Sequence, residues 1–184
     1  MTYSSPAIHA AMSASNWPVE YAEPRWNAAY TCVNQEKRVA SQFSERHVEH
    51  FLPTFESVRR WKDRSVRLQR PLFPGYLFVR LALKDRLKVL MVPSVVRLVG
   101  FNGGPVALSD TEIETMQTSL IPELGAMPHR YLTEGRKVRI VNGPLIGTEG
   151  ILIRKKNAFR VVVSIDLIMR AASVEIDAAD LERI

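Results

Sequence analysis

Residues that could carry out covalent or metal chemistry are few and scattered in this chain. The four histidines are His9, His47, His50 and His129. His47 and His50 have the spacing of neighbours on one helix face, but only Glu49 lies near them in the sequence as a further ligand. A protein zinc site needs three or four such ligands around one ion. The sequence therefore predicts no metal site at this pair.

Cys32 is the only cysteine, which excludes an intramolecular disulfide. It lies at the end of a run that predicts a strand, so we expect a small buried hydrophobe rather than a nucleophile. The chain also has no glycine-rich phosphate loop followed by Lys-Ser or Lys-Thr. We expect a protein that is not an enzyme and that needs no cofactor.

Positive charge is concentrated in one short stretch. Within residues 59–70 the only acid is Asp63, while the basic residues are Arg59, Arg60, Lys62, Arg64, Arg67 and Arg70. The whole chain has a net charge of +6. Such a cluster is typical either of a solvated hairpin tip or of a surface that contacts nucleic acid, and the residues alone leave both open.

The stretch Pro71–Val79, PLFPGYLFV, combines two prolines and a glycine with three aromatic residues. Proline inside a strand is confined to a sheet edge or a bulge. Beyond Gly75, residues alternate, so that Tyr76 and Phe78 point to one side and Leu77 and Val79 to the other. The aromatic side either packs beneath the basic hairpin or forms an exposed apolar surface for a protein partner.

These residues must be positioned by an N-terminal unit of mixed structure. Residues 1–24 predict a disordered leader. The patterns that follow predict strands at 26–33, 51–61, 66–81 and 95–99, and helices at 35–47, 84–91 and 110–120. Ser109 and Glu112 have the spacing of a capping box at the start of the last helix. This order indicates an α+β sandwich at 25–120, with one antiparallel sheet and helices on one of its faces.

The C-terminal part has a different pattern. Residues 121–132 hold two prolines and a glycine without periodicity and predict a linker. Short β-rich runs follow at 138–141, 150–153, 159–165 and 173–176. Their even spacing predicts a small all-β barrel at 133–184. No apolar run reaches the length of a membrane helix and the N-terminus lacks a signal-peptide pattern, so we expect a cytoplasmic protein without a membrane partner.

Six ordered blocks in the N-terminal part resemble one family. They are Trp26-x-Ala28-x-Tyr30-Thr31, Glu36-Lys37-x-Val39, Phe51-Leu52-Pro53, Pro71–Val79, Pro93–Gly100 and Asp110-x-Glu112-Ile113. Together they resemble the N-terminal (NGN) domain of NusG-family transcription elongation factors. Val138–Pro144 with Gly147, Gly150 and the basic turn at 154–157 resembles a KOW motif. Three tracts, Tyr30-Thr31, Trp61–Arg64 and PLFPGYLFV, are more similar to the operon-specific paralogues of the RfaH, LoaP and UpxY type.

The resemblance implies that the N-terminal domain binds bacterial RNA polymerase. It implies docking of an apolar face on the clamp helices of the β′ subunit, through Phe73, Pro74, Tyr76, Phe78, Tyr30, Phe51 and Pro53. It also implies contacts with the β gate loop and the non-template DNA strand, for which the matching residues are Lys84, Arg86 and Lys88. The basic hairpin would face upstream duplex DNA. A monomer that suppresses pausing or termination is expected.

For the C-terminal domain the resemblance implies recruitment of partners. The loop residues are Gly143, Pro144, Leu145 and Ile146, and the basic turn Arg154, Lys155 and Lys156 is suited to RNA. NusE and Rho are the implied partners, although Leu145, Ile146 and Thr148 stand where the general factor tends to have aromatic residues. In RfaH this domain can refold as a helical hairpin; here the valines at 161–163 and the loop glycines favour a barrel.

Two interpretations of function remain open at this point. One is a transcription elongation or antitermination factor that acts on RNA polymerase. The other is a ribosome-associated KOW protein that binds RNA through Arg154, Lys155 and Lys156. The sequence does not decide between a general factor and an operon-specific one, nor whether the two domains dock on each other.

Overall fold

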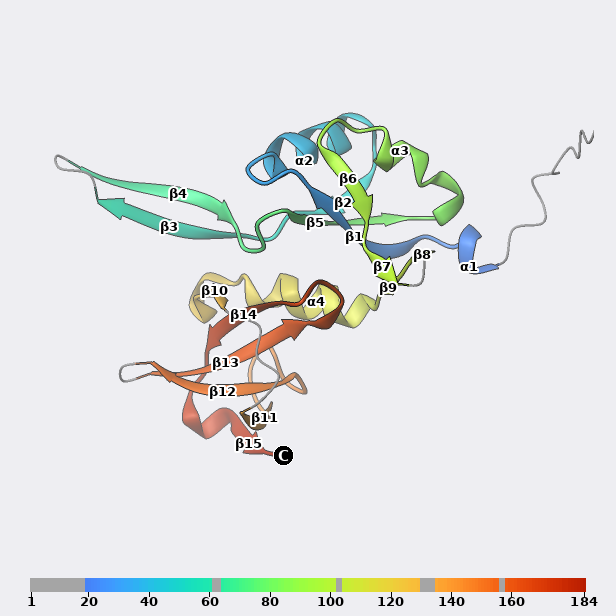
Figure 1. Cartoon of the computed structure of the whole chain (residues 1–184). Coiled ribbons are helices and arrows are strands. Elements are labelled where there is room, and N and C mark those ends of the chain that lie inside the picture. Colours follow the sequence, from blue (N-terminus) through green and yellow to red (C-terminus); the bar gives the residue numbers. More distant parts are fainter. Residues whose placement is uncertain (1–18, 61–63, 102–103, 130–134, 156–157) are drawn as a thin grey trace, which may run out of the picture.

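The computed structural model describes residues 19–60, 64–101, 104–129, 135–155 and 158–184 (Figure 1). Most of the leader expected at 1–24 lies outside these residues. Its last part is not irregular, because Val19–Ala22 forms a short helix, α1. In the described part of the chain, no helix is long and apolar enough to cross a membrane.

The N-terminal unit is built on a five-stranded antiparallel sheet. The strand order is β2-β5-β1-β6, and β9 also pairs with β1. The strands are β1 (Arg25–Thr31), β2 (Glu49–Phe51), β5 (Tyr76–Leu81), β6 (Val95–Leu98) and β9 (Ala107–Leu108). Strand β5 lies between β2 and β1, with Phe51 and Ala28 as the partners of Phe78. The PLFPGYLFV segment therefore leads into the interior of the sheet.

Helices cover both faces of this sheet, whereas the sequence predicted helices on one face only. Helix α2 (Glu36–Glu45), the 3-10 turn η1 (Leu83–Asp85) and α3 (Leu87–Leu90) lie on the first face. Val39 and Phe43 pack there against Leu77 and Val79. Helix α4 (Asp110–Ser119) lies on the second face, where Ile113 packs in one cluster with Ala28 and Phe78. Helix α4 covers the second face because its apolar residues match the aromatic side of β5.

The start of α4 confirms the capping box. The Ser109 hydroxyl accepts a hydrogen bond from the Glu112 backbone N–H, and the Glu112 carboxylate accepts one from the Ser109 N–H. Two of the donors that a helix leaves unsatisfied at its N-terminus are thereby paired.

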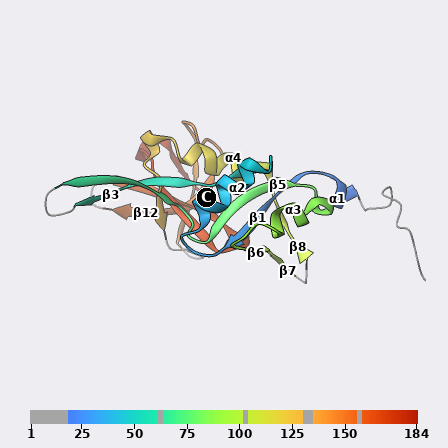
Figure 2. The same ribbon diagram turned by 90° about the horizontal axis from the view of Figure 1, so that it is seen from above.

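A long hairpin projects from the sheet. The runs expected at 51–61 and 66–81 are each divided, so that β3 (Thr54–Arg60) pairs with β4 (Ser65–Pro71) apart from the main sheet. The breaks fall at Pro53 and at the Pro74–Gly75 turn, where a proline cannot donate to a ladder. Figure 2 shows the hairpin extending to one side of the molecule, with α1 at the opposite end. The small pair β7 (Gly100–Phe101) and β8 (Gly104–Pro105) lies beyond β6.

The C-terminal unit is an all-β barrel, as predicted, and has six antiparallel strands where the sequence showed four β-rich runs. Its strand order is β10-β14-β13-β12-β11-β15. The strands are β10 (Met127–His129), β11 (Arg136–Ile140), β12 (Glu149–Lys155), β13 (Ala158–Ile165), β14 (Arg170–Glu175) and β15 (Leu181–Arg183). The 3-10 turns are η2 (Pro122–Leu124), η3 (Asp166–Ile168) and η4 (Ala178–Asp180). Val138, Ile140, Val161, Val163 and Val174 form the barrel core.

The segment expected as a linker is part of this barrel. Leu124 lies in the barrel core, and β10 pairs with β14 through Met127, Pro128 and His129. The last residues of the expected linker, 130–132, lie outside the described part of the chain. The strand was not evident from the sequence because three residues that include a proline carry no β pattern of their own.

The two units share one core. Figure 1 shows α4 between the N-terminal sheet and the barrel. Ile165, Ile168 and Ala172 of the barrel belong to the same buried cluster as Phe78 of the sheet and Met116 of α4. The domains are therefore docked on each other in this structure.

Candidate functional site

The Pro74–Gly75 turn fixes the direction of the aromatic residues on either side of it. Gly75 has φ +83°, a left-handed conformation that favours glycine. The turn is closed by a hydrogen bond of 3.0 Å from the Tyr76 N–H to the Phe73 carbonyl. A second bond, 2.8 Å long, joins the Thr31 N–H to the Gly75 carbonyl. Phe73 and Tyr76 thus leave a rigid turn that is anchored to the end of β1.

Glu36 is a part of this arrangement that the sequence did not reveal. Its side chain is buried, and its carboxylate accepts a hydrogen bond of 2.7 Å from the Gly75 N–H. Glu36 is also the first residue of α2, where the positive end of the helix dipole stabilises a carboxylate. The sequence offered one signal, an acid directly after the turn that follows a strand, but it could not give the partner 39 residues away.

The structure brings the predicted aromatic residues together. Phe73 and Phe78 meet edge to face with ring centroids 6.4 Å apart, and Phe51 stacks on Phe78 at 6.1 Å. Tyr30 and Tyr76 form a second pair at 5.2 Å. We call these five residues the aromatic face. The alternation predicted along β5 is confirmed, since Phe78 lies in this cluster and Leu77 lies in the core under α2 and α3.

The two proline candidates differ in position. Pro53 is buried, and its carbonyl accepts a hydrogen bond of 2.8 Å from the Leu72 N–H. It therefore fixes the base of the hairpin. Pro74 is exposed at the tip of the turn.

The aromatic face is covered, whereas an exposed surface was one of the two sequence interpretations. Phe73 and Phe78 are 1% and 0% exposed. Residues of α4 and of the barrel, including Ile165, Ile168 and Ala172, belong to the cluster that buries them. Tyr30, Phe51 and Tyr76 remain partly exposed at its border. Apolar surface of the barrel meets apolar surface of the sheet, which removes both from water.

Two arginines complete the border of the aromatic face. The Arg170 guanidinium of the barrel lies 5.4 Å from the centre of the Tyr76 ring, and Arg97 of β6 lies 5.7 Å from that of Tyr30. Both distances are within the range of cation–π attraction. Arg97, Tyr30, Tyr76 and Arg170 thus form a continuous row of contacts that crosses from the sheet to the barrel.

The hairpin carries exposed arginines along β4. Arg64, Arg67 and Arg70 are exposed, and Arg67 lies 3.6 Å from Glu56. The backbones of Arg59 and Arg60 end β3, while Lys62 lies outside the described residues. A surface ion pair of this kind contributes little to stability, so Arg67 can exchange Glu56 for another anion at small cost.

A second basic group lies at η1 and α3, far along the sheet from the hairpin. Lys84 and Lys88 are exposed, and Lys88 pairs with Asp85 at 3.2 Å. Arg86 is half-buried and donates to the Leu83 carbonyl. Lys84 and Lys88 border a groove of about 400 Å³ that also contains Arg80. The sequence analysis did not identify Arg80 as a candidate site residue, because the alternation along its strand marks it only as a polar position.

The barrel loop at 143–148 presents the side chain of Ile146 to solvent. Leu145 is buried in the barrel core, but Ile146 is 67% exposed. The Gly147 N–H donates to the Ile140 carbonyl at 2.7 Å, with Gly147 at φ +83°. Gly143 and Pro144 are exposed beside it. Arg154 and Lys155 lie at the end of β12, and Lys156 is outside the described residues.

An interdomain groove of about 460 Å³ lies beside this loop. Ile146 and Glu149 of the barrel face Glu112 and Met116 of α4 across it. Glu149 also pairs with Arg139 of the barrel, and this hydrogen bond raises the pKa of Arg139. Both carboxylates of the groove are therefore engaged within their own units.

Cys32 corrects another expectation, because it is exposed. Strand β1 ends at Thr31, so Cys32 falls just beyond the sheet instead of within it. Among the residues that the structure describes, no group of three or more His, Cys, Asp or Glu side chains is arranged to hold a metal ion.

Comparison with known proteins shows which family this chain belongs to. The model of the family described as transcription termination factor nusG matches residues 24–117, just over half of the chain. The chain belongs to the NusG family. It is 29% identical to transcription termination/antitermination protein NusG of Escherichia coli K12 over 180 residues, covering 89% of this chain and 98% of that protein.

A second curated relative and a solved structure are also NusG proteins. The Haemophilus influenzae NusG is also 29% identical, over 87% of this chain and 94% of its own length. A solved structure concerned with domain interaction in Thermotoga maritima NusG has a TM-score of 0.58 at 21% identity. It covers 89% of this chain and 99% of its own, so the similarity in fold extends through both units. These relatives are NusG proteins, and the resemblance to operon-specific paralogues stays a prediction.

Proposed function

We propose that this NusG-family chain is a transcription elongation and antitermination factor that binds RNA polymerase through its aromatic face. The observation that carries the proposal is the convergence of Phe51, Phe73, Tyr76 and Phe78 on one side of the sheet beside a rigid turn. Aromatic residues held in fixed positions supply large contact area at a low cost in conformational entropy. They suit an apolar helical partner such as the clamp helices of the β′ subunit.

The basic groups extend this contact to nucleic acid. The arginines of β4 lie on one side of the aromatic face, and Lys84, Arg86 and Lys88 lie at the other end of the sheet. We propose that the first group contacts upstream duplex DNA and the second the gate loop and the non-template strand. Contacts with phosphates add affinity that falls with salt and carries no sequence information. Binding on both sides would hold the clamp closed and so suppress pausing or termination.

Binding by the aromatic face requires a change in the arrangement described above. The barrel residues Ile165, Ile168 and Ala172 occupy part of the area that a partner would use. The barrel and the polymerase therefore compete for this surface. Once released, the barrel can present Ile146 and its basic turn to a second partner, for which NusE and Rho are the candidates.

The experiment is binding of the full chain to purified bacterial RNA polymerase core at two salt concentrations. Tyr76→Ser removes a half-buried ring from the aromatic face, whereas Phe101→Ser removes a ring that is 62% exposed on β7 and serves as the control. We expect Tyr76→Ser to weaken binding by about tenfold or more, as truncation of an interface aromatic residue does. The Phe101→Ser protein should bind like the wild type.

Other results would contradict the proposal in different ways. Equal binding by both variants, with a steep fall at high salt, would assign the contact to charge and remove the aromatic face from it. Absence of binding by the wild type, together with tight binding to ribosomal RNA, would favour the RNA-binding alternative.

A further inference from the structure

The connection between α4 and the barrel has no free length. Helix α4 ends at Ser119, and the Leu120 and Ile121 N–H groups donate to the carbonyls of Gln117 and Thr118. The η2 turn begins at the next residue, Pro122. Because α4 packs on the sheet, the segment 122–129 attaches the barrel directly to the N-terminal unit.

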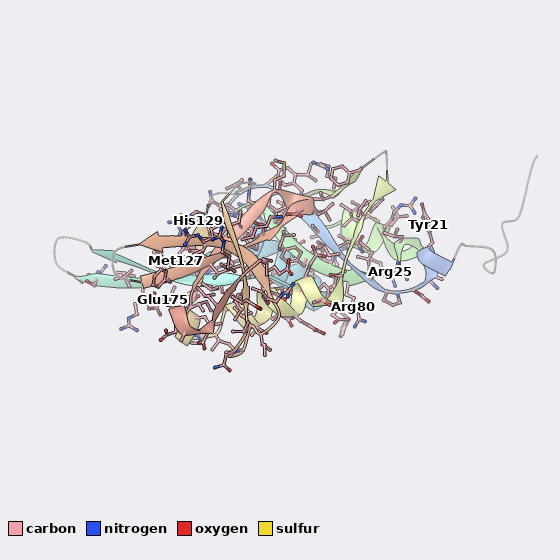
Figure 3. All side chains as sticks on the ribbon, turned by 90° about the horizontal axis from the view of Figure 1, so that it is seen from below. Tyr21, Arg25, Arg80, Met127, His129 and Glu175 are labelled. Atoms are coloured by element: carbon pink, nitrogen blue, oxygen red, sulfur yellow. The ribbon has the colours of Figure 1, made fainter. Side chains whose placement is uncertain are left out.

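Segment 122–129 is bound to the barrel by three kinds of contact. Leu124 is 8% exposed and lies in the barrel core. Strand β10 pairs with β14, and Met127 is the partner of Ser173. The third contact is a hydrogen bond of 2.6 Å from Arg160 to the Gly125 carbonyl. Figure 3 shows Met127 and His129 of β10 at the same end of the barrel as Glu175 of β14.

Arg160 is suited to hold this segment because the rest of its guanidinium is already fixed. Arg160 is 6% exposed in β13. It donates to the Ser173 hydroxyl at 3.2 Å, to the Ser173 carbonyl at 2.9 Å and to Glu175 at 2.9 Å. The bond to Gly125 is the one that leaves the barrel strands and reaches the connecting segment. A hydrogen bond from a charged donor in a buried site is among the stronger ones.

The same segment is also easily detached. Pro128 has no N–H, so β10 cannot form a complete ladder with β14. The strand is only three residues long and lies at one end of the barrel sheet. If 121–129 were released as extended chain, the barrel could move up to about 30 Å from α4. While the segment stays bound, rotation at Leu120 and Ile121 is the only freedom left by these contacts.

We propose that residues 122–129 form a clasp, fastened by Arg160, that must leave the barrel before the barrel can uncover the aromatic face. The consequence for polymerase binding rests on the proposed function, but the clasp itself does not. Residues 122–129 line hollows beside the hairpin and beside the Phe73–Pro74 turn, so the clasp lies at the border of the aromatic face.

The first test needs no polymerase. Arg160→Met keeps the apolar stem and removes the bond to Gly125, and Arg139→Met removes an exposed arginine of the same barrel that pairs with Glu149. Rotational correlation times of the two units are measured separately by ¹⁵N relaxation. We expect one common value for the wild type and Arg139→Met, and a population of separately tumbling units raised about tenfold in Arg160→Met. A common value in Arg160→Met with its barrel folded would overturn the clasp.

The second test locks the clasp. In a Cys32→Ser background, Met127→Cys with Ser173→Cys places two thiols at paired positions of β10 and β14, within reach of a disulfide. The control, Arg139→Cys with Glu149→Cys, links β11 to β12 and leaves the clasp free. Oxidation should abolish binding of the first protein to polymerase core and reduction should restore it, while the control binds in both states.

The two tests separate the clasp from the proposed function. Undiminished binding by the oxidised Met127→Cys/Ser173→Cys protein would mean that the barrel leaves by rotation at Leu120 and Ile121, and would overturn the clasp. If Arg160→Met unfolds the barrel, the clasp is tested instead by polymerase binding of the oxidised and reduced Met127→Cys/Ser173→Cys protein. If no form binds the polymerase, including the wild type, the proposed function fails and the relaxation measurement decides the clasp alone.

Discussion

At the scale of single residues, Glu36 shows how a buried charge can serve a binding surface that it does not touch. Its carboxylate holds the Gly75 N–H, and the turn at Gly75 directs Phe73 and Tyr76. The sequence predicted the aromatic residues because their types and alternation are visible locally. It could not predict the role of Glu36, because nothing in the sequence relates an acid at the start of a helix to a turn that lies in another element.

Replacement of Glu36 by alanine should destabilise the protein. The Gly75 N–H would be left buried without a partner, at a cost of about 1–3 kcal/mol in the free energy of unfolding. Urea unfolding measures the change, with Glu36→Gln expected to lose less because an amide oxygen can still accept. Glu45→Ala, at an exposed position of the same helix, is the control. If Glu36→Ala and Glu45→Ala unfold at the same urea concentration, the hydrogen bond to Gly75 has no measurable role.

At the scale of elements, the local patterns predicted most of the strands and helices, and long-range pairing accounted for the misses. The capping box at Ser109 and the alternation in β5 are properties of neighbouring residues, and both predictions are confirmed. Strand β10 was missed because it exists only through its pairing with β14. Helix α4 was assigned to the wrong face because periodicity identifies an apolar stripe but not the surface that it meets.

The β3–β4 hairpin gives a prediction of its own. Arg67→Gln with Arg70→Gln should reduce binding to duplex DNA and lower the slope of log affinity against log salt by about 2, because each arginine that neutralises a phosphate adds about 1 to that slope. Lys37→Gln with Arg38→Gln removes the same charge from exposed positions of α2 and should leave the slope unchanged. Equal slopes for the two double variants would assign the effect to net charge and not to the hairpin.

At the scale of the whole molecule, the barrel has two apolar surfaces with different roles. One faces its own core at Val138, Val161 and Val174, and the other, at Ile165 and Ile168, faces the N-terminal unit. The sequence predicted the barrel but not its docking, since residues that face a neighbouring unit have the same types and spacing as those that face a core. The sequence indicated which aromatic residues gather on one side of the sheet and left open whether that side is covered; the structure shows it covered.

A charge placed in this interface should release the barrel. Ile168→Asp would bury an unpaired carboxylate between the units, at a cost that disfavours docking without altering the aromatic face. Affinity for polymerase core, measured with the full chain, should rise by about tenfold or more because the competent state becomes the populated one. Ile184→Asp, at an exposed position of the barrel, is the control and should have no effect. Unchanged affinity in Ile168→Asp would mean that the docked barrel does not limit binding.

The covalent connection between the barrel and the sheet has a consequence for dosage. A tethered competitor acts at an effective concentration fixed by its linker, on the order of millimolar for short ones. Raising the amount of this protein in a cell therefore leaves the fraction of molecules with a covered aromatic face unchanged. Dilution does not uncover that face either. A partner that binds the uncovered form shifts the fraction according to the partner's free concentration relative to its dissociation constant, so activity follows the supply of partners and not that of the protein.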